Sequence, residues 1–330
     1  MNALYKDFST AQVRFCLAFP DVYEVGISHL GLKILYTIIN NLDYAMADRT
    51  YLPWTDAIEL MRQDTIPLFA LESKKDVKDF DVLGITLQSE LTYTNILELL
   101  DLSGIPLHAE ERDDKQPLVI GGGPCASNPL PLSPFFDAIL IGEGEEVIEE
   151  IAEVIKSEKY IKPNNNSTDK RRFLSREEVL RKLSVIKGLY VPLIHDECIA
   201  KDKDFRIEIR KYSGFSDNTK THTPQLMSWQ MATHNRYVAE IMRGCTRGCR
   251  FCLAGYFYRP VRERSPVDIL NDLLSEIEEY GWEEAGLSSL SSSDYTCIRP
   301  LLEALLIRVN HQKTHISLPS LRVDSFDDTL

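Results

Sequence analysis

The sequence has no segment that would target it to a membrane or for secretion. Its first residues, MNALYKDFSTAQVRF, contain no apolar signal core, and its apolar runs are too short to span a bilayer. Cysteine is also scarce, with 7 among 330 residues. Without a secretion signal these cysteines are expected to stay free in a reducing compartment. The sequence therefore predicts a cytoplasmic protein without a membrane partner.

Positive charge is in short supply as well. The chain has 37 basic against 50 acidic residues, a net charge of −13. This balance argues against a protein that coats nucleic acids, although a local basic patch stays open. The apolar fraction of 44% is high enough for buried cores, and the length favours two domains.

The N-terminal half alternates apolar strands with amphipathic helices. The expected strands are Val13–Phe19, Val82–Leu87, Leu118–Ile120 and Ala138–Ile141, and the expected helices are Leu32–Asn40, Tyr93–Leu100 and Glu146–Ser157. Such alternation is typical of a parallel sheet covered on both faces. We therefore expect an α/β, doubly wound domain over residues 1–157.

Ligands of doubly wound sheets bind beyond the carboxyl ends of the strands. Gln88 follows one expected strand, and the Gly-rich turns with Gly122 and Gly142 follow two others. Glycine also serves tight turns without any ligand, so both interpretations stay open. Beyond this domain, residues 158–232 are expected to connect, with a helix at Arg176–Leu183, a strand within Gly188–Pro192 and a hairpin over His195–Arg210.

Three of the cysteines lie within eight residues, in the stretch RGCTRGCRFCLAGYFYRPVRER. Cys245, Cys249 and Cys252 form a CxxxCxxC triplet without a second CxxC or a nearby His. Structural zinc takes four ligands. An iron–sulfur cubane is normally held by four cysteines, so three would leave one iron open to a substrate or cofactor. Zinc with a distant fourth ligand and simple core packing are the alternatives.

This triplet, with the aromatic Phe251 before its last cysteine, resembles the cluster loop of the radical S-adenosylmethionine (SAM) superfamily. The setting VAEIMRGCTRGCRFCLAGYFYRPVRERSP is similar to a branch that carries a cobalamin-binding-like domain ahead of the radical domain. The resemblance implies a 4Fe–4S cluster on Cys245, Cys249 and Cys252. It also implies SAM on the fourth iron, and its reductive cleavage to methionine and a 5′-deoxyadenosyl radical.

The same resemblance implies which other residues meet the cofactors. Near the adenine we expect Phe251 and Leu253. In the superfamily, residues after the second strand contact the methionine part of SAM, usually through a Gly-Gly-Glu motif. Here the corresponding residues are Ser292, Ser293 and Asp294. Hydroxyls and a carboxylate can also hold an amino group, although a helix N-cap explains them too. Ser320 and Arg322 follow the third strand and complete the expected SAM site.

Cobalamin is a further candidate cofactor. The resemblance implies a flavodoxin-like, cobalamin-binding-like fold, with His29, Gln88, Gly122 and Gly142 around the ligand. Cobalamin domains that ligate cobalt usually show Asp-x-His-x-x-Gly after the first strand. Here the nearest match is Ile27–Gly31, ISHLG, which lacks the Asp and the spacing. His29 as a helix cap, cobalamin without a protein ligand, and an empty scaffold are the alternatives.

Residues 233–330 read as the first part of a partial (β/α) barrel. Strands are expected at Tyr237–Met242, Ala285–Leu290 and His315–Leu318, with helices at Pro266–Tyr280 and Thr296–Asn310. The superfamily uses six such units, so we expect a fragment of a longer protein, with the C-terminal half of the barrel as its missing partner. The chemistry belongs at the carboxyl ends of these strands.

The sequence thus predicts a radical SAM enzyme with an unknown substrate and a reductant such as flavodoxin or ferredoxin. The alternative is a non-catalytic iron–sulfur or metal-holding module for electron transfer or assembly. A zinc-dependent RNA-binding module fits less well, because the chain is acidic and a fourth zinc ligand is missing.

Overall fold

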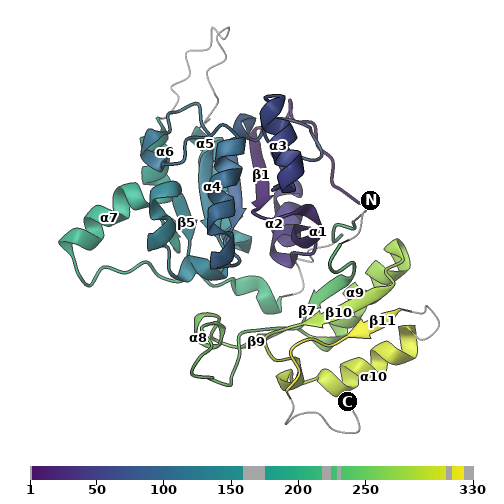
Figure 1. The fold of residues 1–330 in the computed structure, drawn as a ribbon. Coiled ribbons are helices and arrows are strands. Elements are labelled where there is room, and N and C mark those ends of the chain that lie inside the picture. The colour runs from purple at the N-terminus through teal and green to yellow at the C-terminus, as the bar shows by residue number, and fades with distance from the viewer. Residues whose placement is uncertain (1, 159–174, 218–223, 229–231, 310–313, 323–330) are drawn as a thin grey trace. The chain divides into compact units, whose positions relative to one another are not determined.

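The computed structural model describes residues 2–158, 175–217, 224–228, 232–309 and 314–322. The chain forms two compact units (Figure 1). The first comprises Ala3–Tyr212, and the second comprises Ser213–Leu330 together with Met1–Asn2. Each unit has its own sheet and its own buried core. No helix in the described part of the chain is both long and apolar enough to cross a membrane.

The first unit contains a six-stranded sheet in the order β2-β1-β3-β4-β5-β6. Its strands are β1 (Val13–Phe19), β2 (Ala45–Tyr51), β3 (Val82–Thr86), β4 (Leu118–Gly122), β5 (Ala138–Leu140) and β6 (Leu189–Tyr190). β1 to β5 pair in parallel and β6 is antiparallel to β5. The order 2-1-3-4-5 is that of the flavodoxin-like fold, whose ligand crevice lies between β1 and β3. The predicted α/β, doubly wound fold is confirmed.

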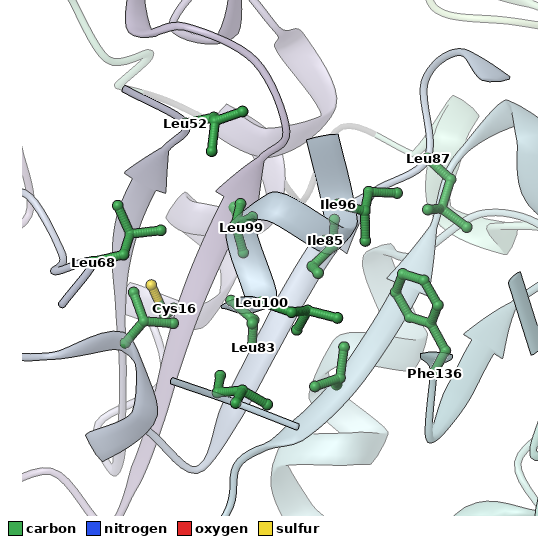
Figure 2. Packing of buried hydrophobic residues seen from close by; sticks show 14 of the residues in the cluster. Cys16, Leu52, Leu68, Leu83, Ile85, Leu87, Ile96, Leu99, Leu100 and Phe136 are labelled. Carbon is green, nitrogen blue, oxygen red and sulfur yellow. The ribbon is translucent and has the colours of Figure 1, made fainter. Parts of the chain in front are cut away.

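Helices follow the strands as the alternating pattern predicted. They are α1 (Tyr23–Gly26), α2 (Leu30–Asn40), α3 (Thr55–Gln63), α4 (Tyr93–Leu102), α5 (Glu145–Glu158), α6 (Arg176–Leu183) and α7 (Pro192–Lys201). Short 3₁₀ turns are η1 (Val77–Asp79), η2 (Glu90–Thr92), η3 (Ala109–Glu111), η4 (Pro124–Ser127), η5 (Leu130–Phe135) and, in the second unit, η6 (Ser213–Ser216). Apolar side chains of β1, β3 and α4 form the main core (Figure 2). Because both faces of a parallel sheet are covered, strands such as β3, β4 and β5 carry nearly continuous apolar residues.

Two elements differ from the sequence expectation. β2, AMADRTY, was not expected, because its polar residues hide the strand pattern. Asp48 is nevertheless fully buried, and its carboxylate accepts hydrogen bonds from the backbone N–H groups of Glu72 and Ser73. The hairpin predicted over His195–Arg210 is wrong, since α7 occupies Pro192–Lys201. Pro192 at the first helical position and His195 Nδ1, which accepts from Val191 N–H at 2.9 Å, start that helix.

A buried charge cluster fastens α6 to the sheet. Asp137 precedes β5 and accepts hydrogen bonds from Arg112, from Arg176 and from the N–H of Val119. Ser175 caps α6 through a reciprocal capping box. The compact unit therefore extends past residue 157 to Tyr212. The stretch expected to connect two domains is divided between the two units, and its residues 159–174, 218–223 and 229–231 lie outside the described part.

The second unit contains a parallel sheet in the order β11-β10-β7. Its elements are β7 (Tyr237–Glu240), β8 (Met242–Arg243), α8 (Ala254–Phe257), β9 (Arg262–Glu263), α9 (Pro266–Tyr280), β10 (Glu284–Ser288), η7 (Ser292–Asp294), α10 (Ile298–Val309) and β11 (His315–Ser317). α9 and α10 connect successive parallel strands. Their apolar faces pack on the sheet in a core of their own. Three βα-type strands in sequence order match the predicted beginning of a (β/α) barrel.

Candidate functional site

The cysteine loop leaves the second unit's sheet after β7 and is closed at its base by a small ribbon. β8 and β9 pair antiparallel, with Met242 opposite Glu263 and Arg243 opposite Arg262. Gly244 opens the loop at φ 89°, and a Cβ there would lie 2.7 Å from the carbonyl oxygen of Tyr258. Only glycine allows this crossing of the two loop ends. The loop is therefore a defined excursion from the carboxyl end of β7.

All three predicted cluster ligands lie in this loop as free, partly exposed cysteines. The N–H of Cys252 donates to the carbonyl oxygen of Cys249 at 3.0 Å, and the N–H of Arg247 donates to Cys245 Sγ at 3.5 Å. Among the described residues, no three His, Cys, Asp or Glu side chains are gathered as ligands of a single metal ion. A cubane normally takes four cysteines, one on each iron, so these three thiols could hold three irons of a cluster and leave the fourth open.

The segment after β10 reaches the cysteine loop through an ion pair. Arg247 Nε donates to Asp294 Oδ2 at 2.6 Å, and Arg247 Nη2 donates to Asp294 Oδ1. The hydrogen bond from Arg247 holds the pKa of Asp294 below its usual value, and the charge of Arg322 acts in the same direction. Two residues predicted around SAM, Asp294 and Arg322, thus lie near one another at the carboxyl edge of this sheet.

The two serines before Asp294 differ in their surroundings. Ser292 is fully buried, and its hydroxyl lies 3.3 Å from the carbonyl oxygen of Leu287 and 3.1 Å from Ser289 Oγ. Its hydroxyl is thus used within the protein. Ser293 Oγ is buried and has no hydrogen-bond partner within the described structure. An orphaned buried hydroxyl at this position is suited to a ligand.

The apolar residues predicted near the adenine are presented to solvent. Phe251 is 92% exposed and Leu253 60% exposed. Leu253 is the N-cap of α8, one residue beyond the last cysteine. Ser320, past β11, has a left-handed φ of 60° and is exposed. These three positions are exposed, so a ligand could reach their side chains.

At the carboxyl edge of the first unit, two predicted residues meet at the β1–β3 switch point. His29 Nε2 and Gln88 Oε1 are 2.9 Å apart, and His29 Nδ1 accepts the N–H of Leu32 at 3.1 Å as the N-cap of α2. Desolvation lowers the pKa of His29. The neutral ring therefore carries its proton on Nε2, so both ring nitrogens are used within the protein.

The Gly-rich turns are occupied by the chain itself. Gly142 has φ 131°, and a Cβ there would lie 2.2 Å from the carbonyl oxygen of Arg210. Glu143 accepts from the N–H of Tyr212 at 2.7 Å. The carbonyl oxygen of Gly122 accepts from the N–H of Leu87 at 2.7 Å. Glycine is therefore required at position 142 because another segment of the protein crosses there.

Sequence reasoning missed two features. One is the pairing of Arg247 with Asp294. The two residues are 47 positions apart, and opposite charge alone does not indicate which distant residues pair. The other is a set of exposed apolar side chains on segments that follow the carboxyl ends of four successive strands of the first unit: Val25, Trp54, Leu91 and Leu130. A single exposed apolar residue carries no signal, and only the strand order puts these four at one edge.

Comparisons with known proteins agree with this architecture. Residues 31–192, a little under half of the chain, match a family described as radical SAM proteins, N-terminal. This match lies within the first unit and does not depend on the cysteine loop. An uncharacterized protein of Methanocaldococcus jannaschii, MJ0966, is 26% identical over 316 residues, which cover 95% of this chain and 56% of the relative.

Two solved structures share the fold across nearly the whole chain. Both are the radical S-adenosylmethionine methyltransferase TsrM from Kitasatospora setae. The form with tryptophan and aza-SAM has a TM-score of 0.54 and 13% identity, covering 96% of this chain and 57% of that one. The form with cobalamin and a [4Fe-4S] cluster has a TM-score of 0.53 and 12% identity, covering 92% and 55%. The chain spans a little over half the length of these relatives.

Proposed function

We propose, from the premise that the chain fits the radical SAM superfamily, that it contains the cluster loop of a radical SAM enzyme. Cys245, Cys249 and Cys252 would hold a 4Fe–4S cluster. The observation that carries the proposal is the placement of three free cysteines in one closed loop at the carboxyl edge of a parallel sheet. Barrel enzymes place their chemistry at this edge.

The residues around the loop fit this cofactor. Three thiols leave a fourth position open, and all three side chains are partly exposed, so both the cluster and a second ligand can approach. When bound, the cluster would supply the electron that cleaves SAM to a 5′-deoxyadenosyl radical. The protein's part is to hold the thiolates and to position the bound SAM. The reducing electron would come from a carrier such as flavodoxin or ferredoxin.

We propose that SAM is held by residues beyond β10 and β11. The buried hydroxyl of Ser293 has a free hydrogen-bonding capacity, which suits the methionine amino group. The guanidinium of Arg322 would attract the carboxylate. Phe251 and Leu253 supply exposed apolar surface for the adenine beside the last cysteine. The Ser292 hydroxyl is used within the turn, so Ser293 is the serine that we propose as a ligand.

For the first unit we propose cobalamin binding at the β1–β3 switch point. The four exposed apolar side chains on the segments that follow the strands give this edge the character of a ligand site, with a few polar groups among them. His29 is engaged on both nitrogens. The ligand would therefore sit against the apolar edge without His29 on the metal.

The test is anaerobic reconstitution of the purified chain with iron and sulfide, followed by dithionite reduction with SAM and chromatography for 5′-deoxyadenosine. We expect about four irons per chain, from the cubane stoichiometry, and formation of 5′-deoxyadenosine. Cys249→Ala should lose most of the bound iron and all cleavage. Cys198→Ala, which removes a partly buried thiol on α7 of the first unit, is the matched control and should behave as wild type.

Other outcomes are informative. A stable cluster without cleavage, in this chain and in a longer one, would favour a non-catalytic iron–sulfur module. Tight stoichiometric zinc without iron would contradict the proposal.

A further inference from the structure

Arg247 links the cysteine loop to the end of β10 through a forked ion pair. The residue lies between Cys245 and Cys249, and its side chain leaves the loop to meet Asp294 with two nitrogens. The Asp294 side chain is 12% exposed and that of Arg247 is 39% exposed. A bidentate pair with a largely buried acceptor fixes geometry far better than an ordinary surface ion pair does.

The acceptor side of this pair is itself held in place. Ser291 Oγ donates to Asp294 Oδ2 at 2.8 Å, and the N–H of Asp294 donates to the carbonyl oxygen of Ser291 at 3.0 Å. The hydroxyl of Ser292, the residue after Ser291, donates to the carbonyl oxygen of Leu287 in β10 at 3.3 Å. Asp294 is therefore anchored to the sheet through a short turn, and Arg247 is anchored to Asp294.

The donor side touches a cluster ligand directly. The N–H of Arg247 donates to Cys245 Sγ at 3.5 Å. Fixing the Arg247 side chain thus restricts the rotation of the peptide group that bonds this sulfur. Hydrogen bonds to cysteine sulfur are among the factors that set the potential of an iron–sulfur cluster.

We propose that Arg247 and Asp294 form a clamp that holds the cysteine loop in the arrangement that takes up the cluster. Asp294 is then a positioning residue for the loop, in place of the role as a ligand of SAM that its sequence position suggested. The proposal rests on the proposed function for its consequence, namely cluster retention. Its structural part, the restraint of the loop, is independent of any metal.

The first measurement uses the metal-free full chain. Hydrogen exchange of peptides covering residues 244–261 is compared among wild type, Arg247→Gln, Asp294→Asn and the exchange variant Arg247→Asp/Asp294→Arg. We expect the two single variants to exchange about fivefold to tenfold faster in this segment, as expected for loss of one charge-assisted fork. The exchange variant should recover at least half of the protection. Arg250→Gln removes the same charge from an exposed position between Cys249 and Cys252 and is the matched control.

The second measurement uses the reconstituted chain. Iron retained after desalting, and the midpoint potential of the retained cluster, are measured for the same variants. We expect Arg247→Gln and Asp294→Asn to reduce iron retention to a similar extent and to shift the potential in the same direction, while Arg250→Gln matches wild type. SAM affinity, measured per assembled cluster, should be changed less than twofold by Asp294→Asn.

The outcomes separate the clamp from the function on which it rests. If Asp294→Asn keeps its iron and loses SAM affinity, Asp294 is a cofactor ligand and the clamp is wrong. If loop exchange in both single variants equals that of wild type, the clamp is also wrong. If the wild type takes up no iron while the two single variants still release the loop, the clamp stands and the proposed function fails.

Discussion

The carboxyl edges of the sheets in the two units differ in how their polar groups are bonded. At the carboxyl edge of the first unit, polar groups are engaged by the protein itself, as in the His29–Gln88 contact and the Glu143–Tyr212 hydrogen bond. At the same edge of the second unit, three cysteines are partly exposed and the Ser293 hydroxyl lacks a partner among the described residues. The named polar groups of the first edge are thus bonded within the protein, whereas those of the second edge are the ones that we propose to bind ligands.

Two buried carboxyls, one in each unit, differ in their hydrogen-bond donors. In the first, Asp137 lies between two arginines, Arg112 and Arg176. In the second, the buried carboxyl of Glu276 accepts a hydrogen bond from the Trp282 indole at 3.1 Å, and burial raises its pKa to about 7. Asp137 is therefore stabilised by pairing with two cations, whereas Glu276 has a neutral donor and is partly protonated near neutrality.

The largest expected effect is on the paired charges of the first unit. Asp137→Ala leaves two buried arginines without their acceptor, and we expect it to lower the free energy of unfolding by about 3–5 kcal/mol. Asp101 forms an exposed ion pair with Arg62, so Asp101→Ala is the control. It should lower the free energy of unfolding by less than about 1 kcal/mol. Urea denaturation followed by circular dichroism measures both, and hydrogen exchange should localise the loss to residues 3–212. Equal small losses would contradict the importance of the buried cluster.

The crossing of Arg210 over Gly142 gives the next effect. Gly142→Ala places a Cβ 2.2 Å from the Arg210 carbonyl oxygen at φ 131°, and we expect a loss of about 3 kcal/mol from backbone strain and displacement. Gly104→Ala, at φ 65° with nothing within 4 Å of the added Cβ, should lose only about 1 kcal/mol. Thermal unfolding of the two variants provides the comparison. Similar losses would mean that the turn is open enough to admit a ligand.

A pH series tests the buried acid of the second unit. Because the pKa of Glu276 is raised to about 7 from 4.5, the folded state binds the extra proton between these values and stability falls as pH rises through this window. Glu276→Gln keeps an acceptor for Trp282 without the charge. We expect equal stability near pH 4.5 and a gain of about 1–3 kcal/mol for the variant at pH 8. Denaturant midpoints at both pH values measure it, and a difference independent of pH would refute the assignment.

The smallest effect concerns the first unit's ligand edge. If cobalamin sits there without His29 on the metal, His29→Ala should change the affinity for hydroxocobalamin less than twofold, measured by its visible spectrum in a titration. The same variant should lose about 1 kcal/mol of stability, because the N-cap of α2 is removed. An affinity loss of tenfold or more would instead place the imidazole on the cobalt.

The predictable features were those that local patterns encode. The apolar strands, the Ser175 cap and the cysteine triplet each carry a signal within a few residues, and the doubly wound fold follows from their alternation. β2 was missed because its buried polar side chains are satisfied by a segment more than twenty residues away, at Glu72 and Ser73. The sequence predicts a hairpin where α7 lies, because this helix has little amphipathic pattern after its initial Pro192.

The candidate site also contains locally encoded features and features that depend on distant residues. The three cysteines are predicted as a cluster site from their spacing alone, because the three possible ligands lie within eight residues. The partner of Asp294 is not predicted in this way, because Arg247 lies 47 residues earlier and only the parallel pairing of β7 with β10 brings the two together. The sequence left two interpretations of the Gly142 turn open, and the approach of Arg210, 68 residues later, is not encoded locally. Neither contact can be predicted from the sequence, because each depends on how distant segments are aligned in the fold.

The most direct test of the central claim is the electron paramagnetic resonance spectrum of the reconstituted, dithionite-reduced chain, recorded with and without SAM. Three cysteine ligands leave one iron open, so SAM should change the signal of the reduced cluster, and Cys249→Ala should show no such signal. A reduced cluster whose spectrum is the same with and without saturating SAM would contradict an open iron in the cysteine loop, and with it the proposed function.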